Sequence, residues 1–280
     1  MRRLLLILLV LPLTVVGCAM PHHRGGTAPA PVRLAYPAAA ADPAQNFGDL
    51  YLPPPSAGGG PHPLLVLFHG GGRRSRIGLA ATAGLARHLS ATGLAVFNAE
   101  YRRVGSGGGF PTTMTDAPAA AGFAATLTRR YREVGPETYL AGHSAGGHLA
   151  VWTAENLARP PAGVLSVAGP LSLKDAADAG DRHVVDLLGG TPTRLPDRYR
   201  YADPGARRCP AVPITIVHGT NDGVVPIANA HRFRARVECP GARIRLVEVP
   251  GGDHLALISP GRPGFTTMTA TVTALTRSRR

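Results

Sequence analysis

The sequence lacks an apolar run long enough to cross a bilayer. Its longest candidate, residues 4–16, is broken by Pro12, whereas a spanning helix needs about 20 apolar residues. Charged residues make up only 17% of the chain and aromatic residues 5%, while 44% of the residues are apolar. A chain of 280 residues with this composition can bury a full core, so extensive disorder is not expected. With no internal repeat and no second domain evident, it fits one large α/β domain.

Two nucleotide-binding motifs that glycine-rich loops often form are missing. The glycines at residues 105–109 are not followed by a Rossmann pattern, and the loop at residues 69–72, His-Gly-Gly-Gly, lacks the Lys-Ser/Thr of a P-loop. The net charge is +13, but the arginines are scattered along the chain and no RNA- or DNA-binding motif surrounds them. Lys174 is the single lysine, a bias typical of genomic composition. We therefore expect no nucleic-acid partner.

The first 17 residues are typical of a secretory signal peptide, because two arginines precede a short apolar stretch with small residues behind it. The run Val-Val-Gly-Cys that ends at Cys18 also resembles the bacterial lipobox, in which the cysteine is lipidated. Two alternatives stay open: cleavage near Gly17 or Ala19 that frees a secreted or periplasmic protein, or lipidation of Cys18 that anchors the chain to a membrane. We favour lipidation.

Residues 18–45 are rich in proline, alanine and glycine and are expected to form a tether. From residue 46 to residue 280, short apolar strands alternate with helical periods. Strands are predicted at 47–52, 63–68, 94–98, 138–141, 163–167, 212–218 and 243–249, and helices at 78–90, 113–132, 144–158, 226–238 and 263–277. This alternation predicts a mostly parallel sheet with helices on both faces. Residues 170–205 are irregular and too long for a bare connection, so a small cap over a site is expected there.

A single serine lies among glycines in the segment Gly142-His143-Ser144-Ala145-Gly146. This G-x-S-x-G pattern, between a predicted strand and a predicted helix, is that of a nucleophile elbow. The tight turn projects the serine oxygen out of the sheet, and glycine is needed two residues away because bulk there would collide with neighbouring strands. Ala145 would begin the helix and leave its N–H free to bind a developing oxyanion.

Three further segments extend this pattern. The glycines after His69 let the N–H groups of Gly70 and Gly71 approach a substrate oxygen, and one such donor lowers a barrier by about 2.7–4 kcal/mol. Asp222 and His254 each follow the end of a predicted strand. The chain order Ser144, Asp222, His254 is that of an α/β-hydrolase, and all three positions lie where such sheets bind ligands.

The sequence therefore resembles the α/β-hydrolase esterases from about residue 46 to residue 275. The branch it resembles pairs HGGG with GHSAGGHLA and includes carboxylesterases, feruloyl and acetyl-xylan esterases, and kynurenine-formamidase-like enzymes. Further points of likeness are Tyr101-Arg102, the segment 187–192 and the turn at 250–254. The resemblance implies an α/β-hydrolase fold with a small or minimal cap. In one departure, Arg73, Arg74 and Arg76 stand where members often have an aromatic residue, which makes the expected site entrance basic.

The expected chemistry is hydrolysis of a small-molecule ester through an acyl-enzyme, with Ser144 as nucleophile, His254 as base and Asp222 orienting the imidazole. No metal or cofactor is required. An arylformamidase-like amide hydrolase and a non-catalytic envelope binding protein on the same fold remain alternatives. Asp253 is badly placed to orient the base. His143, next to the nucleophile, is expected to point away from Ser144 and to have a structural role.

Two cysteines, Cys209 and Cys239, each lie a few residues before a predicted strand. If those strands are parallel neighbours, both cysteines lie at the same edge of the sheet. Because an exported protein permits oxidation, we predict a disulfide between them. Its loop would stabilise the fold by about 3–4 kcal/mol in the chain-entropy model. The alternative is a pair of buried thiols.

Overall fold

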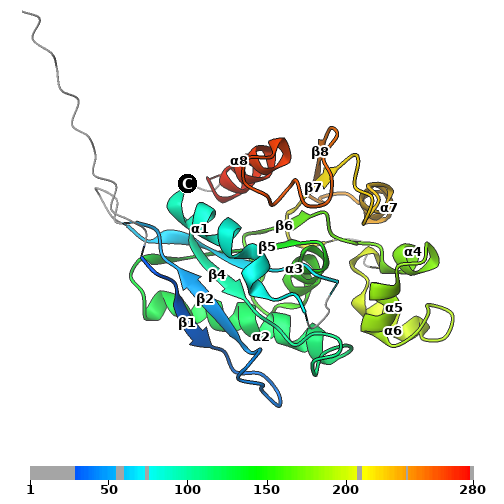
Figure 1. Cartoon of the computed structure of the whole chain (residues 1–280), viewed down its shortest axis with the longest axis horizontal. Helices are drawn as coiled ribbons and strands as arrows, with labels where there is room; N and C mark the ends of the chain where they lie inside the picture. Colours follow the sequence, from blue (N-terminus) through cyan, green and yellow to red (C-terminus); the bar gives the residue numbers. More distant parts are fainter. Residues whose placement is uncertain (1–28, 55–59, 73–75, 207–209, 238, 278–280) are drawn as a thin grey trace, which may run out of the picture.

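The computed structural model describes residues 29–54, 60–72, 76–206, 210–237 and 239–277. The signal peptide, Cys18, Arg73, Arg74 and Cys209 of the sequence predictions lie outside these residues. An eight-stranded sheet in the order β1-β2-β4-β3-β5-β6-β7-β8 forms the centre of the molecule (Figure 1). The strands are β1 Val32–Ala35, β2 Phe47–Tyr51, β3 His62–Phe68, β4 Ala95–Ala99, β5 Val134–His143, β6 Gly163–Val167, β7 Ile214–Gly219 and β8 Ile244–Val249.

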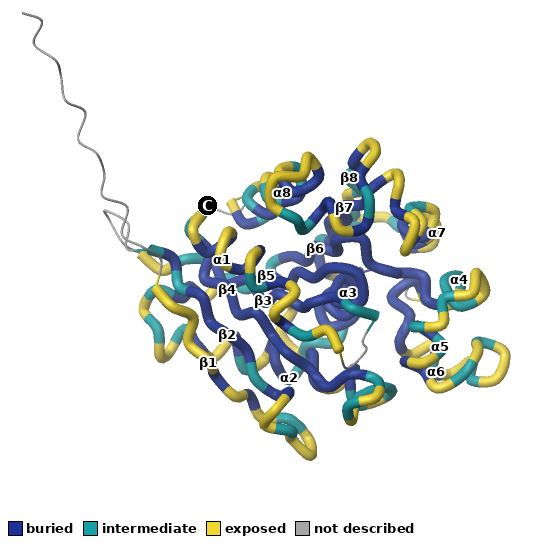
Figure 2. The backbone as a smooth tube through the Cα atoms, in the orientation of Figure 1, coloured by how far each residue is buried: buried dark blue, intermediate teal, exposed yellow. Residues whose placement is uncertain are grey.

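Strands β3 to β8 pair in parallel, and β1 and β2 are joined antiparallel to them at one edge. The strands β3, β4 and β6 are mostly apolar because both faces of the sheet are covered, and Figure 2 shows these strands largely buried. The longer helices are α1 Ala83–Ala91, α2 Thr112–Thr126, α3 Ala145–Asn156, α7 Ala228–Val237 and α8 Pro263–Arg277. This is the mostly parallel α/β architecture that the sequence predicts.

Two apolar cores lie on opposite faces of the sheet. On one face, side chains of α2, α3 and α7 pack against the sheet, with Trp152 and Phe233 among the largest buried groups. On the other face, α1 and α8 supply Leu85, Leu89 and Met268 to the second core. The helices on both faces fix the sheet, so that the carboxyl ends of its parallel strands lie together at one end of the sheet.

The folded unit begins earlier than residue 46. Within the predicted tether, Val32–Ala35 forms β1 and pairs with β2. Tyr36 is buried, and its hydroxyl donates a 2.7 Å hydrogen bond to the Glu100 carbonyl. An edge strand of four residues carries too little periodicity to stand out in a segment rich in alanine and proline.

The segment predicted as a cap is largely helical. It contains α4 Leu173–Asp178, α5 Arg182–Leu188 and α6 Pro196–Ala202, which lie together at one end of the molecule (Figure 1). Asp181 caps α5 by accepting hydrogen bonds from the backbone N–H groups of His183 and Val184. These helices have at most two turns each, so their sequences show no clear period. Residues of α4 and of the start of α5 line the cavity described below.

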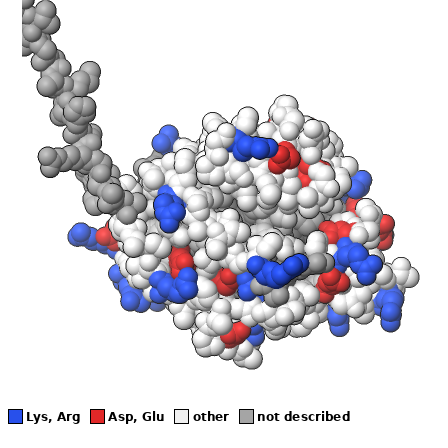
Figure 3. Space-filling view, in the orientation of Figure 1, with Lys and Arg blue, Asp and Glu red and all other residues white. Residues whose placement is uncertain are grey.

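Charge is spread over the surface. On the face shown in Figure 3, Lys and Arg side chains are distributed among Asp and Glu side chains and do not gather in one patch. One buried pair is Arg102 with Asp116: the Arg102 guanidinium donates to both Asp116 oxygens, at 2.9 and 2.6 Å. Among the residues that the structure describes, no helix is long and apolar enough to span a bilayer.

Candidate active site

Ser144 occupies the turn between β5 and α3, as the glycine pattern predicts. Its φ of 54° and ψ of −122° are rare for a residue with a side chain, and such strain is concentrated at functional sites. The turn is held because the Ser144 N–H donates to the Val167 carbonyl at 2.8 Å. The glycines on either side are required by close approach: a Cβ on Gly142 would lie 2.1 Å from the Gly146 oxygen, and one on Gly146 would lie 2.1 Å from the Phe68 oxygen.

The loop after β3 brings Gly70 against this turn. A Cβ on Gly70 would lie 3.2 Å from the Ser144 Cβ and 2.9 Å from His143 Nδ1. Gly71, with φ +111°, follows and also lines the cavity that Ser144 faces. Ala145 is the first residue of α3, so its N–H has no carbonyl partner within the helix. The three residues predicted to bind an oxyanion therefore surround one serine.

A buried polar network supports the glycine loop from beneath. The His69 ring contacts the Gly70 carbonyl oxygen through Nδ1 and Glu100 Oε1 through Nε2, both at 2.7 Å. The ring also stacks on Tyr101 with centroids 4.4 Å apart, and the Tyr101 hydroxyl donates to the His69 carbonyl at 2.8 Å. Glu100 additionally accepts from the Leu79 N–H and from Arg103. These contacts fix the loop on which the oxyanion donors lie.

Asp222 and His254 meet on the loops after β7 and β8. His254 Nδ1 lies 2.8 Å from Asp222 Oδ2, and the Asp222 side chain is fully buried. Asp222 Oδ1 accepts the Val225 N–H at 2.9 Å, and His218 Nε2 lies 3.4 Å from Oδ2. Burial would raise the pKa of Asp222, but the hydrogen bonds from His218, His254 and Val225 outweigh burial and hold that pKa below its usual range.

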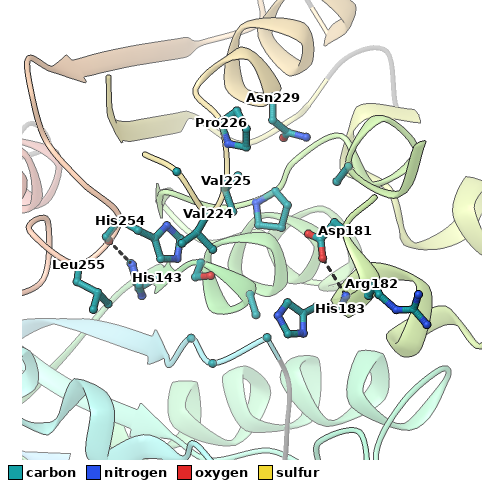
Figure 4. Close-up of a pocket in the computed structure, with 18 of the residues that line it drawn as sticks. His143, Asp181, Arg182, His183, Val224, Val225, Pro226, Asn229, His254 and Leu255 are labelled. Carbon is teal, nitrogen blue, oxygen red and sulfur yellow. Dashed lines mark hydrogen bonds between the residues drawn. The ribbon is translucent and has the colours of Figure 1, made fainter. Parts of the chain in front are cut away.

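The His143 side chain lies against the base. Its Nε2 donates to the His254 carbonyl oxygen at 2.9 Å, and the two rings have centroids 4.7 Å apart (Figure 4). Burial, with a smaller contribution from nearby His254, lowers the pKa of His143 to about 4. A neutral imidazole therefore ties the nucleophile turn to the loop that carries His254.

These residues line one cavity of about 1150 Å³ at the carboxyl ends of the strands. Ser144, His254, Gly70, Gly71 and Ala145 all contribute to its wall. Asp222 lies behind His254. The hydrogen bonds of the described residues include none between the Ser144 hydroxyl and His254, although both side chains face this space.

Several features of the site had no signal in the sequence. His218 precedes Asp222 by four residues in a strand-to-loop segment, and only the folded loop brings the two side chains together. Asp253 orients its own turn: its Oδ1 accepts the Leu255 and Ala256 N–H groups, and its Oδ2 accepts from Arg262. This arrangement explains why Asp253, although adjacent to the base, does not orient the His254 ring.

Cys239 follows α7 and is disulfide-bonded. Its predicted partner, Cys209, lies outside the described residues, so the pairing stays a prediction. Within the described part of the chain, no group of three or more His, Cys, Asp or Glu side chains is arranged to hold a metal ion.

Comparisons with known proteins identify the family and the fold. The profile of the prolyl oligopeptidase family matches residues 106–269, and the profile BD-FAE matches residues 49–159. A curated relative, esterase LipC of Mycobacterium tuberculosis, is 27% identical over 231 residues. The match takes in 74% of this chain but 56% of LipC, so the chain spans little more than half the length of that relative.

Solved structures share the fold at lower identity. A truncated carbohydrate esterase from gut microbiota is 19% identical, with a TM-score of 0.73 over 89% of this chain and 97% of its own. Esterase 2 of Thermogutta terrifontis, solved with propionate bound, is 20% identical, with a TM-score of 0.70 over 88% of this chain and 93% of its own. The same esterase has been solved phosphoramylated by tabun, again at 20% identity and a TM-score of 0.70 over 88% and 93% of the two chains.

The sheet order, the strained serine between strand and helix, and these structural neighbours define an α/β-hydrolase fold. Within that fold, the chain belongs to the prolyl oligopeptidase family, whose profile covers more than half of it.

Proposed function

We propose that this chain is a serine hydrolase that cleaves carboxylic esters through an acyl-enzyme intermediate. The observation that carries the proposal is the 2.8 Å hydrogen bond from His254 to buried Asp222, at a cavity that also exposes Ser144 in a strained turn. A buried carboxylate behind the imidazole fixes its tautomer with Nδ1 protonated, so Nε2 is free to accept a proton. The esterase names of LipC and of the structural neighbours favour esters as substrates.

The proposed reaction runs in two halves. Ser144 Oγ attacks the ester carbonyl carbon while His254 Nε2 takes the hydroxyl proton, and the N–H groups of Gly70, Gly71 and Ala145 bind the resulting oxyanion. His254 then returns the proton to the leaving alcohol, and an acyl-serine remains. Water attacks this acyl group with His254 again as base, which releases the carboxylic acid and restores Ser144.

The reaction requires the Ser144 hydroxyl and His254 Nε2 to come within hydrogen-bonding distance. Catalytic hydrogen bonds are often long in unliganded enzymes and tighten with substrate bound. A change in the Ser144 χ1 angle moves Oγ without disturbing the turn, because the turn is held by the backbone bond to Val167. The fixed partners of His254 mean that the serine, and not the imidazole, makes this adjustment.

Ser144→Ala tests the proposal. We expect the variant to lose turnover of p-nitrophenyl acetate and to lose covalent labelling by a fluorophosphonate, while its circular dichroism spectrum matches that of the wild type. Full activity in this variant would overturn the proposal. If the wild type shows neither turnover nor fluorophosphonate labelling, a non-catalytic binding protein is favoured instead.

Amide hydrolysis is the neighbouring possibility, since the same groups serve both reactions. Comparing p-nitrophenyl acetate with p-nitroacetanilide keeps the acyl group and the aromatic ring constant, and N-formylkynurenine tests the formamide case. We expect kcat/KM to be highest for the ester. A higher value for either amide would reassign the activity.

We also propose that the protein is exported and anchored through lipidated Cys18. Support comes from the sequence alone, since Cys18 follows a positively charged, apolar leader and precedes a proline-rich stretch. Expression of the full chain in a bacterium should place it in the membrane fraction, and Cys18→Ala should release it. Equal membrane association of both forms would refute lipidation at this residue.

A further inference from the structure

The proposed chemistry fixes which half of a substrate lies next to His254. The imidazole must give a proton to the oxygen of the leaving alcohol, so that oxygen must lie within hydrogen-bonding distance of Nε2. The group attached to the oxygen then leaves the reaction centre past the residues that surround His254. The side chains there contact the alcohol half of the ester, and not the acyl half.

Those side chains are apolar and exposed. Within the described residues, five large apolar side chains are exposed, and three of them line this cavity: Ile77 at 42%, Val224 at 62% and Leu255 at 59%. Single exposed apolar residues are ordinary on a protein surface, but a group around one opening marks a binding surface. Val224 and Leu255 lie close to His254 in Figure 4.

The two exposed apolar residues beside His254 lie on turns that hydrogen bonds close. Val224 follows Asp222 by two residues, and its N–H donates to Asp222 Oδ1 at 2.9 Å. Leu255 directly follows His254, and its N–H donates to Asp253 Oδ1 at 3.0 Å. Each side chain therefore extends from a turn that a carboxylate closes, beside a group used in the proposed reaction. Neither is packed into a core, so folding does not explain their apolar character.

The opposite end of the cavity is lined by charged and polar side chains. Asp181, Arg182 and His183, from the start of α5, lie away from His254 in Figure 4. His183 is close to Gly72, so that a Cβ on Gly72 would lie 2.8 Å from its Nδ1. The cavity thus carries exposed apolar side chains beside His254 and charged groups beyond the glycine loop, and the side chains of Arg76 and Arg232 also line it.

We propose that Val224 and Leu255, with Ile77 of the same cavity wall, form a subsite for the alcohol half of the ester, and that this alcohol is an alkyl or aryl group and not a polyol or sugar. The inference rests on the proposed function. The inference extends that function because it assigns a chemical class to the alcohol half of the substrate.

Two acetate esters of equal length test the preference. Hexyl acetate and diethylene glycol monoacetate share the acyl group and have six heavy atoms beyond the ester oxygen, but only the first is apolar. We expect kcat/KM for hexyl acetate to exceed that for the glycol ester by about 10-fold, the size of effect that one or two apolar contacts produce.

The variant Val224→Thr/Leu255→Asn keeps side-chain shape and removes apolar surface. We expect kcat/KM for hexyl acetate to fall by about 30-fold, equivalent to about 2 kcal/mol, and that for the glycol ester to change by less than about threefold. Both side chains are exposed, so the variant should fold. Val32→Thr, on edge strand β1 and absent from the cavity wall, is the matched control and should leave both values unchanged.

The outcomes separate this inference from the proposed function. Equal wild-type activity on the two esters, or a proportional fall of both in the double variant, overturns the apolar subsite while ester hydrolysis stands. Failure of the wild type to cleave either ester, together with no fluorophosphonate labelling of Ser144, overturns the proposed function and the subsite with it. A loss confined to hexyl acetate supports both.

Discussion

Gly146→Ala adds one methyl group at the closest contact between α3 and the sheet. A Cβ at this position would lie 2.1 Å from the Phe68 carbonyl oxygen and 2.5 Å from the His69 carbonyl oxygen. Both are backbone atoms, and β3 cannot yield easily because it is paired with β4 on one side and β5 on the other. The helix and the start of the glycine loop must therefore move apart by about 1 Å to restore ordinary contact.

The cost follows from two opposing effects. Overpacking a rigid contact destabilises a fold by about 1–3 kcal/mol, while replacing glycine by alanine within a helix recovers about 1 kcal/mol. We expect a net loss of up to about 2 kcal/mol, which lowers the Tm by up to about 8 °C in a domain of this size. The effect on kcat should be larger, about 100-fold, because a displacement of about 1 Å moves the oxyanion donors relative to Ser144.

Gly122→Ala is the matched control, because Gly122 also lies in a helix and a Cβ there would meet nothing within 4 Å. It should raise the free energy of unfolding by about 1 kcal/mol and leave turnover unchanged. Thermal unfolding by circular dichroism and p-nitrophenyl acetate kinetics measure both variants. If Gly146→Ala were as stable and active as Gly122→Ala, close approach at the elbow would not be the reason for its glycine.

Two further predictions concern the charges of the site. Asp222→Asn should lower kcat by about 10⁴-fold, because the amide no longer holds the required tautomer of His254; a decrease of less than about tenfold in steady-state kinetics would contradict this role. The pKa of His143 is lowered by burial from 6.5 to about 4, so between these pH values the unfolded chain binds a proton that the folded chain does not. The free energy of unfolding should therefore decrease as pH falls from 6.5 to 4, and urea titrations should show a shallower decrease in His143→Gln; identical slopes would rule out a buried neutral imidazole.

The sheet and the elbow were predictable because each rests on local sequence. Continuous apolar runs such as that of β3 can be stable only when both faces are covered, and the glycines around Ser144 meet a steric demand within five residues. The convergence of Asp222 and His254 also followed, since residues after adjacent parallel strands meet at one edge. In all these cases, the physical constraint acts within a few consecutive residues or through the regular pairing of strands in the sheet.

Other features depend on contacts that no short stretch encodes. β1 exists because an open edge of β2 was available for pairing. The contact of the His143 ring with His254 joins residues 111 positions apart, which no local pattern of the sequence encodes. The role of His218 depends on how the Asp222 loop folds back over the end of β7.

The placement of α4, α5 and α6 has a consequence for how this scaffold can diversify. They form a single excursion between β6 and β7, which are already hydrogen-bonded neighbours in the sheet. Changes in the exposed part of this excursion need not alter strand register, because the two strands that flank it are already paired. Part of the cavity wall can thus change by exchange of this segment, while Ser144, Asp222 and His254 stay on the turns and loops that follow β5, β7 and β8.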